Sequence, residues 1–409
     1  MIHLGALVLV LSAGSPEEAP EYTLRVGPIQ EDLAQVVLQA EIPEAPETAA
    51  AFLTKDGVEV SADAGPLDTG MGKKPFVVVW IAPEIKKGAT AEWKLRIGNR
   101  KDARPGRITT KKLPDGALEV DIGGKLFTRL IDGPKDRKPY LYPVLIDTVA
   151  LTRGYPMENL PGEDKDHEHH RSIWFTHGDV NGVDFWSEGP KAGRIVQVDA
   201  RTTPEDGQDF QVLLPIASMN EWVTPDGKKL LHDWRILFIY DLGAAGRLLD
   251  FMIVLLAQDA PVTFGDTKEG TFGIRLAESM KETRGGRILN SRGQAGMKNT
   301  WGKSAEWVDY SGPIAGKTWG VAILDHPKSF RHPTTWHVRD YGLFAANPFG
   351  LKDFTGDKTK DGSHRLERGG RLTFRYRVYL HPGTPEDAKV AAAWRAYADP
   401  PLVTVEKIK

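Results

Sequence analysis

The stretch Gly370–Gly383, GRLTFRYRVYLHPG, shows the pattern that decides the fold. Arg375 and Arg377 alternate with Tyr376 and Val378, which is the period of two expected of a β-strand with one buried face. The run is longer than an average strand, so it predicts an extended sheet rather than a small one.

Six further stretches share this character, with apolar residues at alternate positions and Gly, Pro or Asp turns between the runs. They are LEVDIGGKLFTRLI (118–131), GRIVQVDARTT (193–203), FQVLLPIASMNEWV (210–223), LLHDWRILFIYDL (230–242), RLLDFMIVLLAQ (247–258) and KTWGVAILDHP (317–327). Together they predict an all-β fold, with a large antiparallel β-sandwich of two extended sheets at residues 115–409. One C-terminal helix is expected in the alanine-rich stretch 385–399, which has Pro385 at its start.

The first hundred residues show a different organisation. Short apolar runs within residues 21–105 predict a small, immunoglobulin-like β-sandwich. The polar, turn-rich segment 98–120 predicts the domain boundary. Residues 1–20 have an apolar core at Leu4–Leu11 and then small and acidic residues, which indicates a signal peptide and a secreted or periplasmic protein. Because the apolar core is preceded by no Lys or Arg, a buried first strand is the alternative.

Composition limits the classes of function. The 409 residues include 53 basic and 55 acidic ones that are interspersed, so no nucleic-acid partner is expected. Apart from the leader there is no apolar run of the length of a membrane span, and the absence of cysteine excludes thiol chemistry.

The segment 164–186, DKDHEHHRSIWFTHGDVNGVDFW, contains four of the 11 histidines. A strand from Arg171 to His177 would put His170 at its beginning and place Asp179 and Asn181 in the turn that follows. The alternative is that the histidines are solvated and the turn residues only shape the turn. His167, His169 and His170 with Asp166 could also bind a divalent metal, but the spacing matches no tight ligand motif, so no metal or other cofactor is expected.

Two later segments add polar residues. FGDTKEGTFGIRLAE (264–278) places Lys268 beside Glu269, a pair that is usually a surface ion pair but that acts as a base or an acid beside histidines. LDHPKSFRHPTTWHVRDYGLFAANPFG (324–350) mixes His332, His337 and Arg339 with aromatic residues. Aromatic rings beside fixed donors are typical of sugar-binding sites, and a structural loop is the alternative.

Four stretches together carry a family resemblance: PYLYPVLIDTVALTRGYP (139–156), DHEHHRSIWFTHGDVNGVDFW (166–186), GDTKEGTFGIRLAE (265–278) and RHPTTWHVRDYGLFAANPFG (331–350). In this order they resemble the PmoA-like family of bacterial proteins of unknown function, over about 118–381. The family label suggests a methane oxygenase, but such a subunit is a bundle of membrane helices, which this sequence does not predict. The family is similar to the galactose-mutarotase-like supersandwich group, which implies a sugar site with His and carboxylate groups as acid and base. One departure is DHEHH at 166–170, where relatives are expected to have DHPHH.

These observations predict a carbohydrate-active protein that carries out acid/base chemistry at a sugar carbon, by epimerisation, hydrolysis or elimination. His170 or His177 is expected to donate a proton and Glu269 to accept one. The alternatives are a non-catalytic glycan-binding protein and a metal-dependent oxidoreductase. The predicted catalytic residues are His170, His177, Glu269 and His337, and the predicted substrate-binding residues are Arg171, Asp179, Asn181, Lys268, His332 and Arg339.

Overall fold

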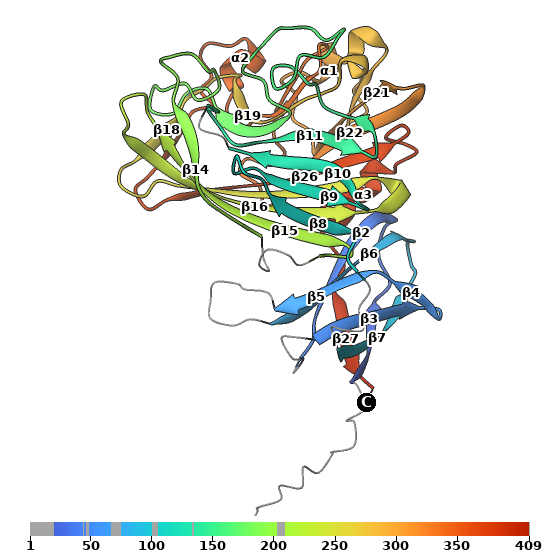
Figure 1. Cartoon of the computed structure of the whole chain (residues 1–409). Coiled ribbons are helices and arrows are strands. Elements are labelled where there is room, and N and C mark those ends of the chain that lie inside the picture. Colours follow the sequence, from blue (N-terminus) through green and yellow to red (C-terminus); the bar gives the residue numbers. More distant parts are fainter. Residues whose placement is uncertain are drawn as a thin grey trace, which may run out of the picture.

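The computed structural model describes residues 20–43, 45, 49–66, 75–99, 105–132, 135–202 and 209–408. These residues form an all-β protein in which a small two-sheet module lies against a large two-sheet sandwich (Figure 1). The predicted fold class is therefore confirmed. Residues 1–19 of the predicted signal peptide lie outside the described residues. In the part of the chain that the structure describes, no helix is long and apolar enough to cross a membrane.

The small module pairs a five-stranded sheet, in the order β27-β1-β7-β3-β4, with a three-stranded sheet, β2-β6-β5. Its core includes Trp80 and Trp93, whose rings meet edge to face at 5.3 Å. The sequence predicts residues 403–407 within the larger domain, but this segment is β27 and pairs with β1, so the end of the described chain completes the small module. The predicted domain boundary within residues 98–120 stays a prediction. The strands are β1 (Glu21–Val26), β2 (Leu33–Glu41), β3 (Ala49–Lys55), β4 (Val58–Val60), β5 (Ala62–Pro66), β6 (Phe76–Ile85), β7 (Ala91–Asn99) and β27 (Val403–Lys407).

The large sandwich has a nine-stranded and an eight-stranded antiparallel sheet. The nine-stranded sheet follows the path β23-β24-β19-β13-β11-β10-β9-β8, with β12 paired to β11. Its strands are β8 (Ile108–Lys112), β9 (Leu118–Ile122), β10 (Lys125–Ile131), β11 (Tyr140–Ile146), β12 (Val149–Ala150), β13 (Ile173–His177), β19 (Gly270–Arg275), β23 (Trp336–Val338) and β24 (Leu343–Ala346).

The eight-stranded sheet has the order β14-β15-β16-β17-β26-β22-β21-β20. Its strands are β14 (Arg194–Thr202), β15 (Leu213–Val223), β16 (Lys229–Asp241), β17 (Arg247–Leu256), β20 (Arg287–Asn290), β21 (Trp307–Ile314), β22 (Lys317–Asp325) and β26 (Arg371–Pro382). A two-stranded ribbon, β18 (Val262–Phe264) with β25 (His364–Leu366), lies outside both sheets. The remaining elements are α1 (Met297–Thr300), α2 (Leu351–Thr355), α3 (Val390–Ala398) and single 3-10 turns at Gly243–Ala245, Glu278–Met280 and Glu282–Arg284.

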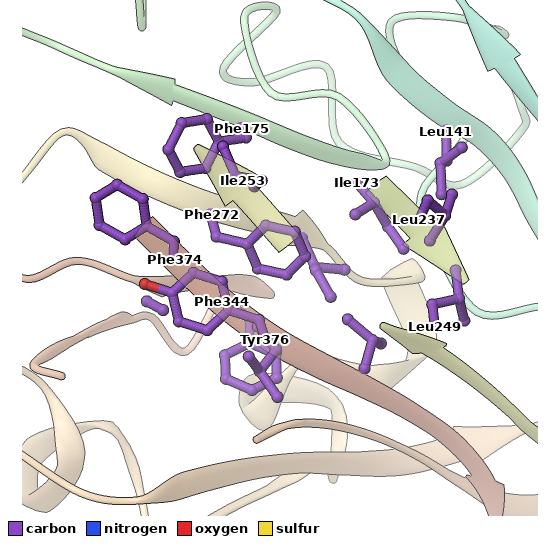
Figure 2. Packing of buried hydrophobic residues seen from close by; sticks show 14 of the residues in the cluster. Leu141, Ile173, Phe175, Leu237, Leu249, Ile253, Phe272, Phe344, Phe374 and Tyr376 are labelled. Atoms are coloured by element: carbon purple, nitrogen blue, oxygen red, sulfur yellow. The ribbon is translucent and has the colours of Figure 1, made fainter. Parts of the chain in front are cut away.

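The main core fills the space between the two large sheets. Figure 2 shows Phe175 and Phe272 of the nine-stranded sheet packed toward Ile253, Phe374 and Tyr376 of the eight-stranded sheet. The alternation read from β26 holds, since Phe374 and Tyr376 face this core while Arg377 lies on the opposite face and pairs with Asp250. Burying each such aromatic or aliphatic side chain stabilises the fold by roughly 1.5–3 kcal/mol.

Helix α3 packs on the outer face of the eight-stranded sheet, where Val390 and Ala393 belong to one apolar cluster with Tyr240 and Tyr379. Apolar residues of β2 and β6 join the same cluster, so the small module and α3 cover this face together. The helix begins at Val390 rather than at Pro385, because Lys389 has a left-handed backbone, with φ of 54°, that interrupts it. The outer face of the nine-stranded sheet is covered instead by the loops that contain the histidine-rich motifs.

Candidate functional site

Strand register brings three distant segments together on the outer face of the nine-stranded sheet. Trp174 of β13 is opposite Gly273 of β19, Gly273 is opposite Ala345 of β24, and Ala345 is opposite His337 of β23. Residues directly opposite one another in antiparallel strands point to the same face. Because their sequence neighbours belong to the interior core, this row points outward, toward the loops.

Four aromatic rings stack in series, beginning with Trp174 of this row and ending with Tyr341. His170 lies nearly parallel to Trp174, with ring centroids 5.4 Å apart, and to His167, with centroids 4.7 Å apart. His167 in turn stacks on Tyr341 at 4.9 Å. The turn that positions them has a left-handed His167 and a hydrogen bond from the His170 N–H to the His167 carbonyl. Trp186 meets the edge of His170 at 5.7 Å, so an aromatic wall forms from two loops and one strand.

A buried ionic cluster supports the stack from the side. Arg153 and Arg275 are both fully buried, and both donate to Asp166 Oδ1. The other oxygen of Asp166 accepts from Nδ1 of His167 at 2.8 Å. Burial alone would raise the pKa of Asp166, but Arg275, Arg153 and His167 together hold it well below its ordinary value. Arg275 also hydrogen-bonds Nδ1 of His170 at 3.2 Å, so it ties β19 to the histidine turn.

Arg171 belongs to a second ionic cluster rather than to the strand. Arg171 precedes β13, which begins at Ile173. Its guanidinium pairs with Glu188 and lies over the ring of Tyr140 at 5.5 Å. Glu188 also pairs with the fully buried Lys138, whose ammonium donates to the Trp186 carbonyl at 2.8 Å. Burial lowers the pKa of Lys138 to about 8, although Glu188 opposes that change. This cluster fixes the loop that carries Trp186.

The other end of the row carries Lys268, Glu269, His337 and Arg339. Lys268 and Glu269 form an ion pair and keep 41% and 34% of their side chains exposed, so they lie at the rim. His337 is buried, and this burial, followed by the charge of Arg339, lowers its pKa. Arg339 lies over the ring of Tyr341 at 5.6 Å. Tyr341 therefore joins the rim to the ring stack.

Three histidines of this face, His169, His170 and His337, are held neutral at physiological pH. Burial lowers the pKa of His169 to about 4, with Lys138 and His167 acting in the same direction and Glu269 opposing them. Burial, followed by Arg275, takes the pKa of His170 well below its ordinary value. Burial likewise lowers the pKa of His337 to about 3. In the neutral form these imidazoles are suited to form hydrogen bonds rather than to act as imidazolium acids, and their lowered pKa makes them weak bases.

Four predicted site residues lie elsewhere. His177 is opposite Gly270, so it shares the inward face of Phe175 and packs against Phe349, with its Nε2 on the Gly265 carbonyl at 2.9 Å. Asp179 accepts from the Gly182 N–H, and Asn181 accepts from the Thr263 N–H. Both shape the loop, as in the alternative that we considered. His332 bonds the buried Asp325, at the end of β22 in the other sheet.

Several residues of the site were missed in the sequence: Arg153, Arg275, Lys138, Trp186, Glu188 and Tyr341. A signal was present for two of them, because Arg153 and Arg275 each stand in a run of otherwise uncharged residues, VALTRGYP and GTFGIRLA. A charged residue within such a run is almost never buried unless it is paired. Asp166, which we considered only as a metal ligand, is the partner of both arginines.

The histidine cluster does not have the arrangement of a metal centre. Within the described ranges, no group of three or more His, Cys, Asp or Glu side chains is placed to hold an ion. His167 and His170 stack face to face, with their planes 10° apart. Their ring planes therefore do not converge on a common point as ligands do.

Fold and site together define the class: an all-β sandwich protein with a histidine- and arginine-rich site on the loop-covered face of one sheet. The chain belongs to a family of unknown function (DUF6807), whose model matches residues 117–395. No curated protein matches the chain. The resemblance to the PmoA-like family stays an expectation.

One solved structure similar to this chain is an alpha-mannosidase from Enterococcus faecalis V583, at 12% sequence identity and a TM-score of 0.41. The match covers 97% of this chain and 46% of that chain, so this chain spans less than half the length of the mannosidase. A TM-score this low carries no argument about fold or substrate.

Proposed function

We propose that this protein binds a carbohydrate or glycoside on the outer face of the nine-stranded sheet and carries out acid/base chemistry at a sugar carbon. One observation carries the proposal. Trp174 Nε1, Trp186 Nε1 and His337 Nδ1 are buried, gather on this face, and have no hydrogen-bond partner within the described residues. A buried polar group left without a partner costs about 1–3 kcal/mol. A ligand whose oxygen atoms both accept and donate hydrogen bonds, as hydroxyl groups do, offsets that cost.

The aromatic wall narrows the ligand to one with apolar faces as well as oxygen atoms. Trp186, Tyr341 and His167 bring ring faces and ring edges to the same region as the donors. Sugars combine apolar C–H faces with hydroxyl groups at their edges. They bind where aromatic rings stack on the C–H faces and fixed polar groups hydrogen-bond the hydroxyl groups. A wholly apolar ligand would leave the donors unpaired.

The rim supplies the groups for proton transfer. Glu269 is a partly exposed carboxylate held by Lys268, and it acts on the pKa of both His169 and Tyr341. We assign Glu269 as the base and His169, neutral at physiological pH, as the group that relays or shares the proton. His170 serves as a positioning residue, because its Nδ1 is occupied by Arg275. His177 faces the interior core, so we no longer assign it a proton-donating role.

Non-catalytic glycan binding is the second candidate. It is favoured by the ionic pairing of Glu269 with Lys268, which also occurs at surfaces without any catalytic role. Both candidate functions involve the same sugar ligand, but only the enzyme converts it into a product. We retain export to the periplasm or the outside as part of the proposal, on the basis of the apolar stretch at Leu4–Leu11.

The test is a product-resolved screen of plant and algal oligosaccharides, including 3-keto derivatives, with the native protein, Glu269→Gln and Glu367→Gln. Glu367 is the matched control, because it is also a glutamate paired with one neighbouring cation, Arg365. We expect turnover by the native protein and the control and at least a hundredfold loss in Glu269→Gln. Sugar binding without any product would select the non-catalytic candidate. Absence of both binding and turnover would reject the proposal.

A further inference from the structure

Arg339 differs from the other arginines of the site. Arg153 and Arg275 pair with Asp166, and Arg171 pairs with Glu188. Within the described part of the chain, Arg339 has no carboxylate partner, and its Nε is buried without any hydrogen-bond acceptor. A partly buried guanidinium without a counter-ion is costly, since burial favours pairing of charges.

The position of Arg339 relates it to the sugar site. It follows β23 two residues after His337, whose pKa it lowers, and it lies over the ring of Tyr341. Glu269 also acts on the pKa of Tyr341, but that carboxylate is already paired with Lys268. Arg339 is thus held beside the aromatic wall with its donors available. Its planar guanidinium fits the two oxygens of an oxyanion, which it binds through two parallel hydrogen bonds.

From this arrangement we infer that the ligand is an acidic sugar, one whose ring carries a carboxylate or a sulfate group, and that Arg339 binds that group. The inference rests on the proposed function, because the sugar ring itself is bound by the aromatic wall and the buried donors. Arg339 selects among sugars, whereas Glu269 carries out the chemistry. A neutral sugar would leave the Arg339 charge unpaired in the complex.

Calorimetric titration of the full chain tests the inference with three probes of one length: an oligogalacturonide, the neutral galacto-oligosaccharide and its sulfated form. The variants are Arg339→Gln, Arg339→Lys and, as a control, Arg368→Gln, which removes one exposed cation from the turn after β25. We expect the native protein and the control to bind at least one anionic probe about tenfold or more tightly than the neutral one. Arg339→Gln should lose that preference without losing affinity for the neutral probe, and Arg339→Lys should keep part of it.

The outcomes separate this inference from the proposed function. The anionic probe that binds more tightly identifies the group as carboxylate or sulfate. Equal affinity of the native protein for all three probes would overturn the inference while leaving sugar binding in place. Binding of none of the probes would overturn both. A preference that survives in a folded Arg339→Gln protein, checked by circular dichroism, would show that Arg339 is not the selecting residue.

Discussion

The guanidinium of Arg275 lies 3.2 Å from Nδ1 of His170, and both side chains are buried. Arginine can only donate, so Nδ1 accepts and the neutral ring carries its proton on Nε2. This contact fixes both the orientation and the tautomer of a histidine that precedes β13, from a residue on β19. The ring stack therefore depends on a segment about a hundred residues further along the chain.

Removing the carboxylate of Asp166 tests whether the ionic cluster holds the site together. In Asp166→Asn, the fully buried Arg153 and Arg275 lose their counter-ion. Loss of one partner from a fully buried pair costs about 3–5 kcal/mol; we expect roughly 2–3 kcal/mol here, because water reaches part of Asp166. Urea unfolding measures this free energy. Glu367→Gln at an exposed ion pair should change it by less than about 0.5 kcal/mol, and equal effects of the two variants would contradict the assigned role of Asp166.

Gly273→Ala tests the row of residues under the stack. A Cβ at position 273 would lie 2.7 Å from Cζ2 of Trp174, closer than two carbon atoms can approach. We expect a loss of unfolding free energy of about 1–3 kcal/mol and altered tryptophan fluorescence, because the indole must move. Gly65→Ala in β5, where a Cβ meets nothing within 4 Å, is the matched control. A Gly273→Ala protein as stable as Gly65→Ala would show that Trp174 does not lie over this glycine.

The pH dependence of stability tests the interior placement of His177. Burial lowers the pKa of His177 to about 4, whereas the unfolded chain has the ordinary value near 6.5. Between these values the unfolded state binds the proton and the folded state does not, so unfolding becomes easier as pH falls from about 6.5 to about 4. One pKa unit corresponds to about 1.4 kcal/mol, so His177 accounts for a loss of about 3 kcal/mol at most.

His177→Gln keeps a donor for the Gly265 carbonyl but removes the titration. Unfolding free energies measured at pH 7, 6, 5 and 4.5 should therefore fall less steeply in the variant than in the native protein. The half-buried His169 and the buried His337 still titrate in both proteins, so only the difference between the two slopes reports on His177. Identical slopes would place His177 in water rather than in the core.

Periodicity predicted the strands better than it predicted the site. Alternation along β26 separated Tyr376 and Val378 from Arg377, and the structure confirms that these residues lie on opposite faces. Alternation alone does not say which face the loops cover, so His177 was grouped with residues that point the opposite way. His332 was grouped with the site by sequence proximity, but Asp325 holds it at the end of β22 in the other sheet.

The three predicted segments do converge, but through residues that motifs do not reveal. His170 meets Arg275 and His167 meets Tyr341, contacts that arise only when the antiparallel order of β13, β19, β24 and β23 is known. A single sequence gives the strands without their order in the sheet. The ionic cluster around Asp166 was hidden for the same reason, since its two arginines come from different segments.

A crystal structure of the protein soaked with the tightest-binding oligosaccharide of the titrations tests the central claim most directly. The account predicts a sugar ring against Tyr341 and Trp186, with its oxygens within hydrogen-bond distance of Arg339 and Glu269. A sugar bound at any other place, such as the apolar interior between the two large sheets or the surface of the small module, would contradict it.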